Sequence, residues 1–391
     1  MTSTQRGWRT LWLASALCFF GCSCSSNFIE DDYEGYPYPV RADVIVVRNP
    51  TVQPTTRPDP STFDDFLRTF PYIGGEVLDP ANLSESQQKA ITATLDQYFG
   101  TPTSPKILDI TEEQANRLNL NSDTLKGTVR RYKHSCVQCH GATGNGRGPT
   151  GLFSEPMPRD FRLGKFKLVT GKGHATGRPR QADLKQVMKL GLPGIPGMVA
   201  SGLTDTENAA FAGYVVYLSL RGEVEAALLR EVLDVEGSPN PDYDALAKQT
   251  LQKALHAWIK ADEPNPWTMT VADGPKEVTP EYTESIRRGA ALFGSAKTGC
   301  VTCHENHGST PTYRYNVWGI PYRVRDLTQR DRHFVRDGLD AARLFKFGLH
   351  SANMPAQPEL SEQELTDLVN LTRELPYPAR LPAELRFQNA K

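Results

Sequence analysis

The feature that most constrains this chain is a five-residue pattern, C-x-x-C-H, that occurs twice. CVQCH spans residues 136–140 and CVTCH spans residues 300–304, which places the two copies 164 residues apart. Only three other cysteines occur, and all of them lie within the first 24 residues. A cysteine pair at this spacing can bind a zinc ion, work as a redox dithiol or hold a covalently attached haem.

The histidine that follows each pair favours the third of these uses. Two thiols at this spacing reach the two vinyl groups of one haem, and the next histidine then lies beneath the iron. A four-thiolate zinc site would leave both histidines without a role and would require two distant pairs to meet. A thioredoxin-like dithiol would need a βαβ setting, which the sequence does not contain. We therefore predict two covalently attached haem c groups, bound at Cys136, Cys139, His140, Cys300, Cys303 and His304.

The first 21 residues have the pattern of an export signal. Two arginines precede the ten-residue apolar run 11–20, which is too short to span a bilayer. The FFGC that ends this region resembles a bacterial lipoprotein signal, with Phe19 where such signals usually carry Leu. The resemblance implies lipidation at Cys22, with Cys24 as a competing site. We expect an exported, periplasmic protein that is anchored to the membrane as a lipoprotein.

Composition and charge set the broad class. With 391 residues, of which 39% are hydrophobic, the chain is long enough for two or three compact units. The formal net charge of −1 gives no basis for nucleic-acid binding. Residues 27–80 are rich in Pro, Tyr and Asp, and their EGYPYP and PTTRPDPS stretches cannot form a helix interior or a central strand.

An internal repeat surrounds the two C-x-x-C-H motifs. A short helical segment precedes each motif, with Gly127 and Tyr132 in the first copy and Gly289 and Phe293 in the second. Each motif is followed, tens of residues later, by a methionine in a loop that contains Gly or Pro. A capping box then begins another helix in each copy. The residues of this second part are Met198, Thr204 and Glu207 in the first copy, and Met354, Ser361 and Glu364 in the second. Gly222 and Pro376 are expected to end these two helices.

This order of parts resembles class I cytochrome c over about residues 123–221 and 282–375. The resemblance implies a mainly α fold with two class I cytochrome c domains in tandem. It also implies that His140 and His304 are proximal ligands of the haem irons, and that Met198 and Met354 are the distal ligands. A lone methionine more often fills a core, but these two lie in loops that no apolar periodicity explains. Thioether sulfur is an established axial ligand that raises the potential of a haem.

Several residues compete for roles around the two sites. The alternative distal ligands are Met157, Met188 and His174 in the first copy, and His350, His333 and His307 in the second. In the family, a proline carbonyl fixes the proximal histidine, and Pro149 and more loosely Pro311 match that position. Arg159, Lys165 and Arg323 could neutralise haem propionates, although a solvated surface charge is the simpler interpretation of each.

We predict the following organisation. A signal peptide (1–21) precedes an extended Pro- and Tyr-rich tether or arm (22–83) and a helical extension (84–121). The first cytochrome c domain (122–235), a helical linker (236–279) and the second cytochrome c domain (280–391) follow. A capping box at Ser84 and Gln87 begins the helix of the extension. Residues 245–259 form an amphipathic helix of the linker.

Two functions fit these features. The first is single-electron transfer by a di-haem cytochrome between exported or membrane-bound redox proteins. Such partners include a quinol-oxidising complex, a dehydrogenase, a terminal oxidase or a soluble cytochrome. The second is a di-haem peroxidase, which needs an open coordination position on one iron. A methionine in the matching position of both copies favours electron transfer over peroxide chemistry.

Overall fold

The computed structural model describes residues 38–49, 51–53, 76–154, 157–193, 195, 198–234, 236–265, 267–331 and 334–386. The expected signal peptide, Cys22, Cys24, His333 and most of the segment 22–83 lie outside the described residues, as does the side chain of His174. The described residues belong to one compact unit, Tyr36–Lys391. We call residues 38–265 the N-terminal half and residues 267–386 the C-terminal half.

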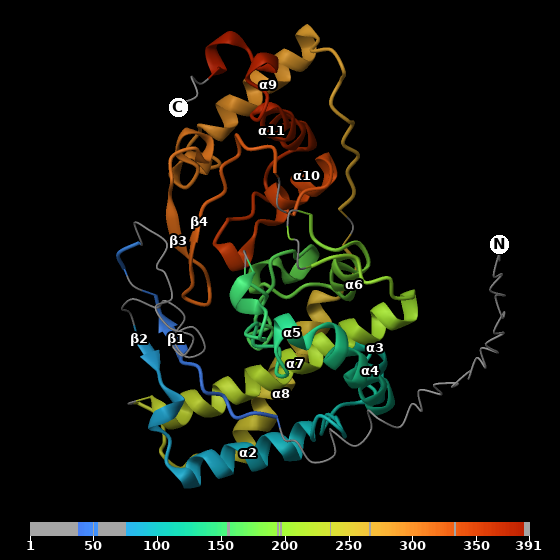
Figure 1. Cartoon of the computed structure of the whole chain (residues 1–391), viewed down its shortest axis with the longest axis vertical. Helices are drawn as coiled ribbons and strands as arrows, with labels where there is room; N and C mark the ends of the chain where they lie inside the picture. The colour runs from blue at the N-terminus through green and yellow to red at the C-terminus, as the bar shows by residue number, and fades with distance from the viewer. Residues whose placement is uncertain are drawn as a thin grey trace, which may run out of the picture. The chain divides into compact units, whose positions relative to one another are not determined.

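The fold is mainly helical, as the sequence predicts (Figure 1). The α-helices of the N-terminal half are α2 (Glu85–Phe99), α3 (Glu112–Leu118), α4 (Ser122–Ser135), α5 (Val137–His140), α6 (Gln181–Leu190), α7 (Asp205–Leu233) and α8 (Tyr243–Ala261). Those of the C-terminal half are α9 (Pro280–Phe293), α10 (Gly338–Phe347) and α11 (Glu362–Glu374). The 3₁₀ helices are η2 (Pro80–Asn82), η3 (Gly151–Phe153), η4 (Gly171–Thr176), η5 (Cys300–Thr302), η6 (Glu305–Gly308), η7 (His350–Ala352), η8 (Pro378–Arg380) and η9 (Ala383–Leu385).

Two small antiparallel sheets complete the described structure. Strand β1 (Ile45–Arg48) pairs with β2 (Glu76–Leu78), and Ile45 lies opposite Leu78. Strand β3 (Tyr313–Tyr315) pairs with β4 (Pro321–Arg323). The first sheet shows that part of the segment predicted as a tether or arm forms regular structure.

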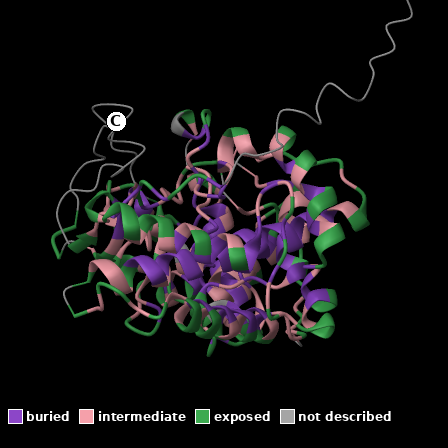
Figure 2. Ribbon diagram, turned by 90° about the horizontal axis from the view of Figure 1, so that it is seen from below, coloured by how far each residue is buried: buried purple, intermediate pink, exposed green. Residues whose placement is uncertain are grey.

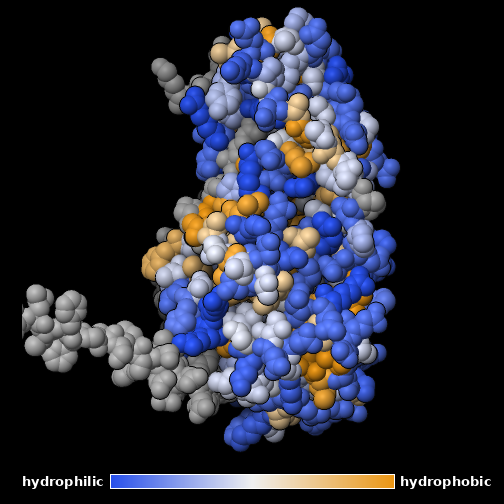
Figure 3. Space-filling view, turned by 90° about the vertical axis from the view of Figure 1, so that its right-hand side faces the viewer, coloured by the Kyte–Doolittle hydropathy of each residue, from blue (hydrophilic) through white to orange (hydrophobic). Residues whose placement is uncertain are grey.

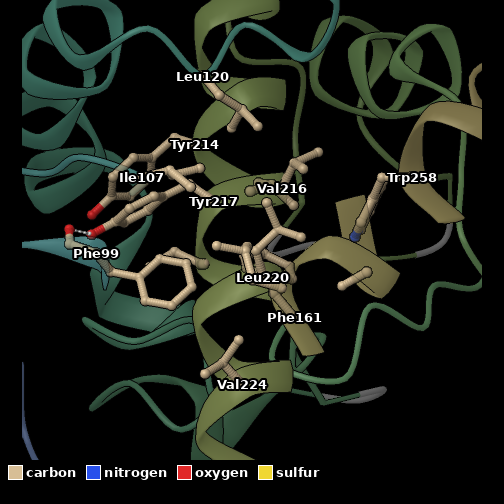
Figure 4. Packing of buried hydrophobic residues seen from close by; sticks show 14 of the residues in the cluster. Phe99, Ile107, Leu120, Phe161, Tyr214, Val216, Tyr217, Leu220, Val224 and Trp258 are labelled. Carbon is tan, nitrogen blue, oxygen red and sulfur yellow. Dashed lines mark hydrogen bonds between the residues drawn. The ribbon is translucent and has the colours of Figure 1, made fainter. Parts of the chain in front are cut away.

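Helix α7 is the centre of the N-terminal half. Its side chains are buried along most of its length (Figure 2), and α2, α4, α6 and α8 all pack against it. Figure 4 shows Tyr214, Tyr217, Leu220 and Val224 of α7 among aromatic and aliphatic side chains of its neighbours. A helix that is apolar on nearly all sides belongs inside a core, so α7 organises the elements that carry the candidate site.

The predicted end of this helix at Gly222 is wrong, because α7 continues to Leu233. Gly222 lies where α7 meets the chain at Arg162, and a Cβ at position 222 would stand 2.3 Å from the Cβ of Arg162. The glycine therefore permits a close approach of two backbone segments and does not end the helix. The predicted end at Pro376 is confirmed, since α11 ends at Glu374.

The predicted helix starts are confirmed. The side-chain and backbone hydrogen bonds of a capping box are present at Ser84 of α2, Thr204 of α7 and Ser361 of α11. Each box satisfies backbone N–H groups that a helix start would otherwise leave without partners. Helix α8, which the sequence places in a linker, packs on α7 and buries Leu251, Leu255 and Trp258 in the core of the N-terminal half.

Helices α9 and α11 form the core of the C-terminal half together with α10. The two helices α9 and α11 approach closely at Gly289, where an added Cβ would lie 2.2 Å from the carbonyl oxygen of Asp367. Gly127, its predicted counterpart in α4, is exposed, and a Cβ there would have no neighbouring atom within 4 Å. The two glycines therefore have different roles, although the sequence pattern makes them equivalent.

The face drawn in Figure 3 is mainly hydrophilic, and its apolar residues form scattered groups. In the part of the chain that the structure describes, no helix has the length and apolar character needed to cross a membrane.

Candidate functional site

The first C-x-x-C-H motif begins where α4 ends. Cys136 follows α4 directly, and the next four residues form the single turn α5. The Gly-rich loop after the motif folds back onto this turn, with Gly146 N–H donating to the carbonyl of His140 (2.9 Å) and Gly148 N–H donating to that of Cys139 (3.1 Å). A Cβ at Gly148 would lie 2.2 Å from the carbonyl oxygen of Val137. The loop therefore needs this glycine to hold the motif turn.

His140 is fixed by one backbone carbonyl and one aromatic ring. Its Nδ1 donates to the carbonyl oxygen of Arg159 at 3.1 Å, which leaves the Nε2 lone pair available to a metal ion. The ring stacks on Phe161 with centroids 4.6 Å apart and planes at 24°. Burial lowers the pKa of His140 to about 4, so the imidazole is neutral at physiological pH, as an iron ligand must be. The predicted acceptor, Pro149, is wrong, because that residue is exposed and Arg159 supplies the carbonyl.

The second motif fixes its histidine in the same way. Nδ1 of His304 donates to the carbonyl oxygen of Arg325 at 3.1 Å, and burial lowers the pKa of this imidazole as well. Pro311, the looser expectation for this acceptor, is exposed. The ring of His304 lies 6.2 Å from that of Phe293, which also contacts His307. Both motif histidines therefore have the same tautomer, set by a carbonyl about twenty residues further along the chain.

An apolar cavity lies beside His140. It encloses about 960 Å³ of space that no protein atom fills, counting the part that opens to solvent. Its wall combines the motif with three methionines, two basic residues and many apolar side chains. The lining residues that matter here are Cys139, His140, Met157, Met188, Met198, Arg159, Lys167, Phe161, Phe166, Val215 and Phe334. The structure thus brings Met198 together with His140, and it does the same for the rivals Met157 and Met188.

The two methionine loops have matching hydrogen bonds. In each half a helix ends at a glycine with positive φ, Gly191 after α6 and Gly348 after α10. The next residue then donates its N–H to the methionine carbonyl: Leu192 to Met198 at 2.8 Å, and Leu349 to Met354 at 2.9 Å. A Cβ on either glycine would stand 2.5–2.6 Å from that same carbonyl oxygen. Glycine is therefore required twice for one loop geometry, and Met198 and Met354 occupy equivalent places in it.

A further hydrogen bond separates Met198 from its rival Met188. The N–H of Ser201 donates to the carbonyl of Met188, and in the C-terminal half the N–H of Gln357 donates to the carbonyl of Phe345. Met188 therefore corresponds to a phenylalanine, which cannot ligate iron. Met157 lies two residues before Arg159, in the segment that holds His140.

Of the rival histidines in the C-terminal half, His350 lies within the Met354 loop itself, as the first residue of η7. The ring of His350 lies against Gly177, where an added Cβ would stand 2.5 Å from its Cδ2. His307 lies beside Phe293, whose ring is also near that of His304. Met354 is half-buried in the loop that matches the Met198 loop. The equivalence of the two loops thus favours Met354 over both histidines.

The four motif cysteines are free thiols. Burial raises the pKa of Cys136 to about 11, and Cys139 Sγ lies 3.1 Å from the hydroxyl of Thr150. Among the residues with described positions, no three His, Cys, Asp or Glu side chains gather as a metal site would require. The two thiol pairs therefore do not meet in one four-thiolate zinc site.

Two basic side chains line the cavity, and only one of them was anticipated. The Arg159 guanidinium lies 3.8 Å from the ring centroid of Trp318, and loss of solvent lowers its pKa to about 9. Lys167 lies over the ring of Phe334 at 4.6 Å, and burial lowers its pKa well below the usual value. The interpretation of Arg159 as a solvated surface charge is therefore wrong. Lys165 does not line the cavity, and Arg323 is exposed on β4.

Comparison with known proteins does not assign a family. No family model matches the chain, and no curated protein matches it. A chain from the reducing HAO-like protein complex of Kuenenia stuttgartiensis resembles it at a TM-score of 0.41 and 20% identity, over 68% of this chain and 97% of that chain. This likeness is too distant to carry an argument about function, so the case for the site rests on the residues themselves.

Proposed function

We propose that this protein is a di-haem c-type cytochrome that transfers single electrons between redox proteins. The observation that carries the proposal is the repeated geometry of the two halves. Each C-x-x-C-H histidine donates Nδ1–H to a backbone carbonyl, and each half has a methionine in the same glycine-bounded loop. One C-x-x-C-H motif can occur by chance. Two motifs whose histidines and methionines are held by the same contacts in both halves are a stronger indication of two haem sites.

The residues of the N-terminal half fit a haem. The cavity is mainly apolar and is bordered by Cys139, His140 and Met198. Arg159 and Lys167 would supply positive charge for the haem propionates in this mainly apolar cavity, whose lining also includes the acidic Asp183. When bound, the haem supplies one-electron chemistry, and the protein supplies axial ligands and burial that set the potential.

The C-terminal half supports a second haem through Cys300, Cys303, His304 and Met354. The two class I cytochrome c domains in tandem are part of this proposal. We also propose export, and anchoring through a lipid on Cys22. The partners would then be membrane-bound or periplasmic redox proteins, such as a quinol-oxidising complex, a dehydrogenase, a terminal oxidase or a soluble cytochrome.

The experiment is to produce the chain in a host that attaches haem c and to extract the purified protein with acidified acetone. The colour should stay with the polypeptide at two haems per chain. One haem per chain, or zinc in its place, contradicts the proposal. The mature mass tests the anchor separately, because a chain that begins at any residue other than Cys22 or Cys24 excludes lipidation there.

The alternative function, a di-haem peroxidase, is tested on the same protein. Two irons that each carry histidine and methionine have no vacant position, so cyanide and carbon monoxide should bind poorly and peroxide should turn over slowly. Rapid cyanide binding to one haem after half-reduction, with fast peroxide consumption, would replace electron transfer by peroxidase activity as the function.

A further inference from the structure

A cluster of buried charges joins the beginning of the described chain to the first site. The carboxylate of Asp43 accepts two hydrogen bonds from Arg162, at 2.8 Å from Nη1 and 2.7 Å from Nη2. The side chains of Asp43 and Arg162 are only 6% and 2% exposed. Breaking a buried pair of this kind leaves an uncompensated charge inside the protein, so this contact holds the segment around Asp43 on the N-terminal half.

Arg162 is also bound to its own neighbourhood. Its Nε donates to Asp160 at 3.0 Å, and its Nη2 donates to the same carboxylate at 2.7 Å. Burial alone would raise the pKa of Asp43, but the charges of Arg162, Arg41 and Arg147 outweigh burial and hold the pKa well below its usual range. Asp43 is therefore ionised, and it balances the charge of Arg162 together with Asp160.

The segment that Arg162 anchors is the one that fixes His140. The carbonyl of Arg159 accepts the Nδ1 proton of His140, and the ring of Phe161 stacks on the imidazole. The N–H of Phe161 donates to the carbonyl of Gly144 at 2.7 Å. Arg159 and Phe161 thus hold His140 and its loop, and Arg162, the next residue, connects this segment to the buried cluster.

Helix α7 confines Arg162 from another direction. A Cβ at Gly222 would lie 2.3 Å from the Cβ of Arg162 and 2.5 Å from its Cα. The segment 159–162 is therefore held electrostatically by Asp43 and sterically by α7. In the C-terminal half the residue that supplies the carbonyl is Arg325, the counterpart of Arg159, and its own side chain pairs with Asp331, which is 65% exposed. An exposed pair of this kind holds its segment far less firmly.

We propose that Asp43 is a positioning residue of the first haem site, which acts through Arg162 on the carbonyl that holds His140. This inference rests on the proposed function. The segment around Asp43 is then part of the site and not only a connection to the N-terminus. A firm Nδ1–H hydrogen bond makes the imidazole a stronger donor to ferric iron, which lowers the potential of that haem. Loss of the contact should therefore raise this potential.

The experiment uses the full-length chain with ¹⁵N-labelled histidine and measures the solvent exchange of the ring Nδ1–H groups of His140 and His304. Asp43→Asn keeps the shape of the side chain and removes its charge. Gly222→Ala keeps every charge and displaces Arg162. Both variants should accelerate the exchange at His140 and leave His304 unchanged. In the haem-loaded protein, both should raise the midpoint of one of the two reduction steps.

Two controls separate positioning from general loss of stability. Tyr98→Phe removes the hydrogen bond from α2 to Asp244 in the same half, away from residues 159–162, and should leave the His140 exchange unchanged. Asp367→Asn removes a buried carboxylate of the C-terminal half and should also leave it unchanged. Unchanged exchange at His140 in Asp43→Asn or in Gly222→Ala overturns the inference. A chain without haem overturns the proposed function alone, because ring exchange still reports how His140 is held.

Discussion

The two halves of this chain hold their motif histidines with the same contact but surround them differently. In the N-terminal half, His140 stacks on Phe161 and faces a large apolar cavity, and the supporting segment is fixed by buried charges. In the C-terminal half, His304 lies beside Phe293, and its supporting arginine pairs with an exposed aspartate. The contact that orients the histidine is thus repeated in the two halves, whereas the charges that support the contact are buried in one half and exposed in the other.

The largest expected effect comes from removing attachment. Cys136→Ser with Cys139→Ser, and Cys300→Ser with Cys303→Ser, should each halve the haem content per chain. The first pair should also lower the melting temperature more, because it leaves the apolar cavity beside His140 unfilled. Haem absorbance and thermal denaturation measure these effects, and equal melting temperatures for the two double variants would contradict the difference between the halves.

The methionine loops give the next effect. Met198→Ala and Met354→Ala should each remove about half of the weak absorption band near the red edge that methionine-ligated ferric haem shows. Each should lower the reduction potential of the haem that loses its methionine, by a sizeable part of the roughly 0.8 V range over which axial ligands set this potential. Met188→Leu is the matched control and should change neither property. If Met198→Ala leaves the band and the potentials unchanged and Met188→Leu changes them, then Met188 and not Met198 is the distal ligand.

Asp43, which is buried, and Asp331, which is exposed, should differ in how much they contribute to the free energy of unfolding and in how that contribution depends on pH. Asp43→Asn should lower the free energy of unfolding by up to about 3–5 kcal/mol, since it removes the carboxylate that the buried Arg41 and Arg162 share, although Asp160 still pairs with Arg162. Asp331→Asn should change it by less than about 1 kcal/mol. Because the pKa of Asp43 is depressed in the folded state, its contribution is complete above its unfolded pKa of about 4 and is lost only as the pH falls further. Chemical denaturation of both variants from pH 8 to pH 3 measures this, and a difference from wild type that already shrinks above pH 5 would contradict it.

The two helix glycines give the smallest effects, of opposite sign. Gly289→Ala should destabilise the C-terminal half by about 1–3 kcal/mol, because its Cβ would meet the Asp367 carbonyl oxygen at 2.2 Å. Gly127→Ala should stabilise the N-terminal half by about 0.5–1 kcal/mol, because α4 has open space there and alanine is the better helix former. Urea denaturation of both variants tests the difference, and the same sign for both would contradict it.

Sequence reasoning predicted the features that depend on local chemistry. The starts of α2, α7 and α11 follow from capping boxes, whose hydrogen bonds involve residues only three positions apart. The mainly helical character follows from apolar periodicity in the same way. These signals lie within single helical turns, so they can be read without knowledge of the fold.

The supports of the candidate site could not be predicted for a physical reason. The acceptors for His140 and His304 are main-chain carbonyls of Arg159 and Arg325, and a carbonyl leaves no signature in the side-chain sequence. Lys167 could not be predicted as a cavity residue, because its position depends on packing against Phe334, which is far away in the chain. Gly222 was misinterpreted for a similar reason, since a glycine that ends a helix and one that admits a neighbour look alike in sequence.

The contacts made by residues 38–43 also bear on how the molecule assembles. Tyr38 meets Tyr214 across 176 positions of the chain, and Asp43 meets Arg162 across 119. Contacts between such distant positions form slowly, because a long loop must close, with a loss of chain entropy, before the contact can stabilise the fold. The helical elements around α7 can form first from nearby residues, and the N-terminal residues then join them. The pairing of Asp43 with Arg162, and with it the full support of the segment that holds His140, would therefore form in one of the last folding steps.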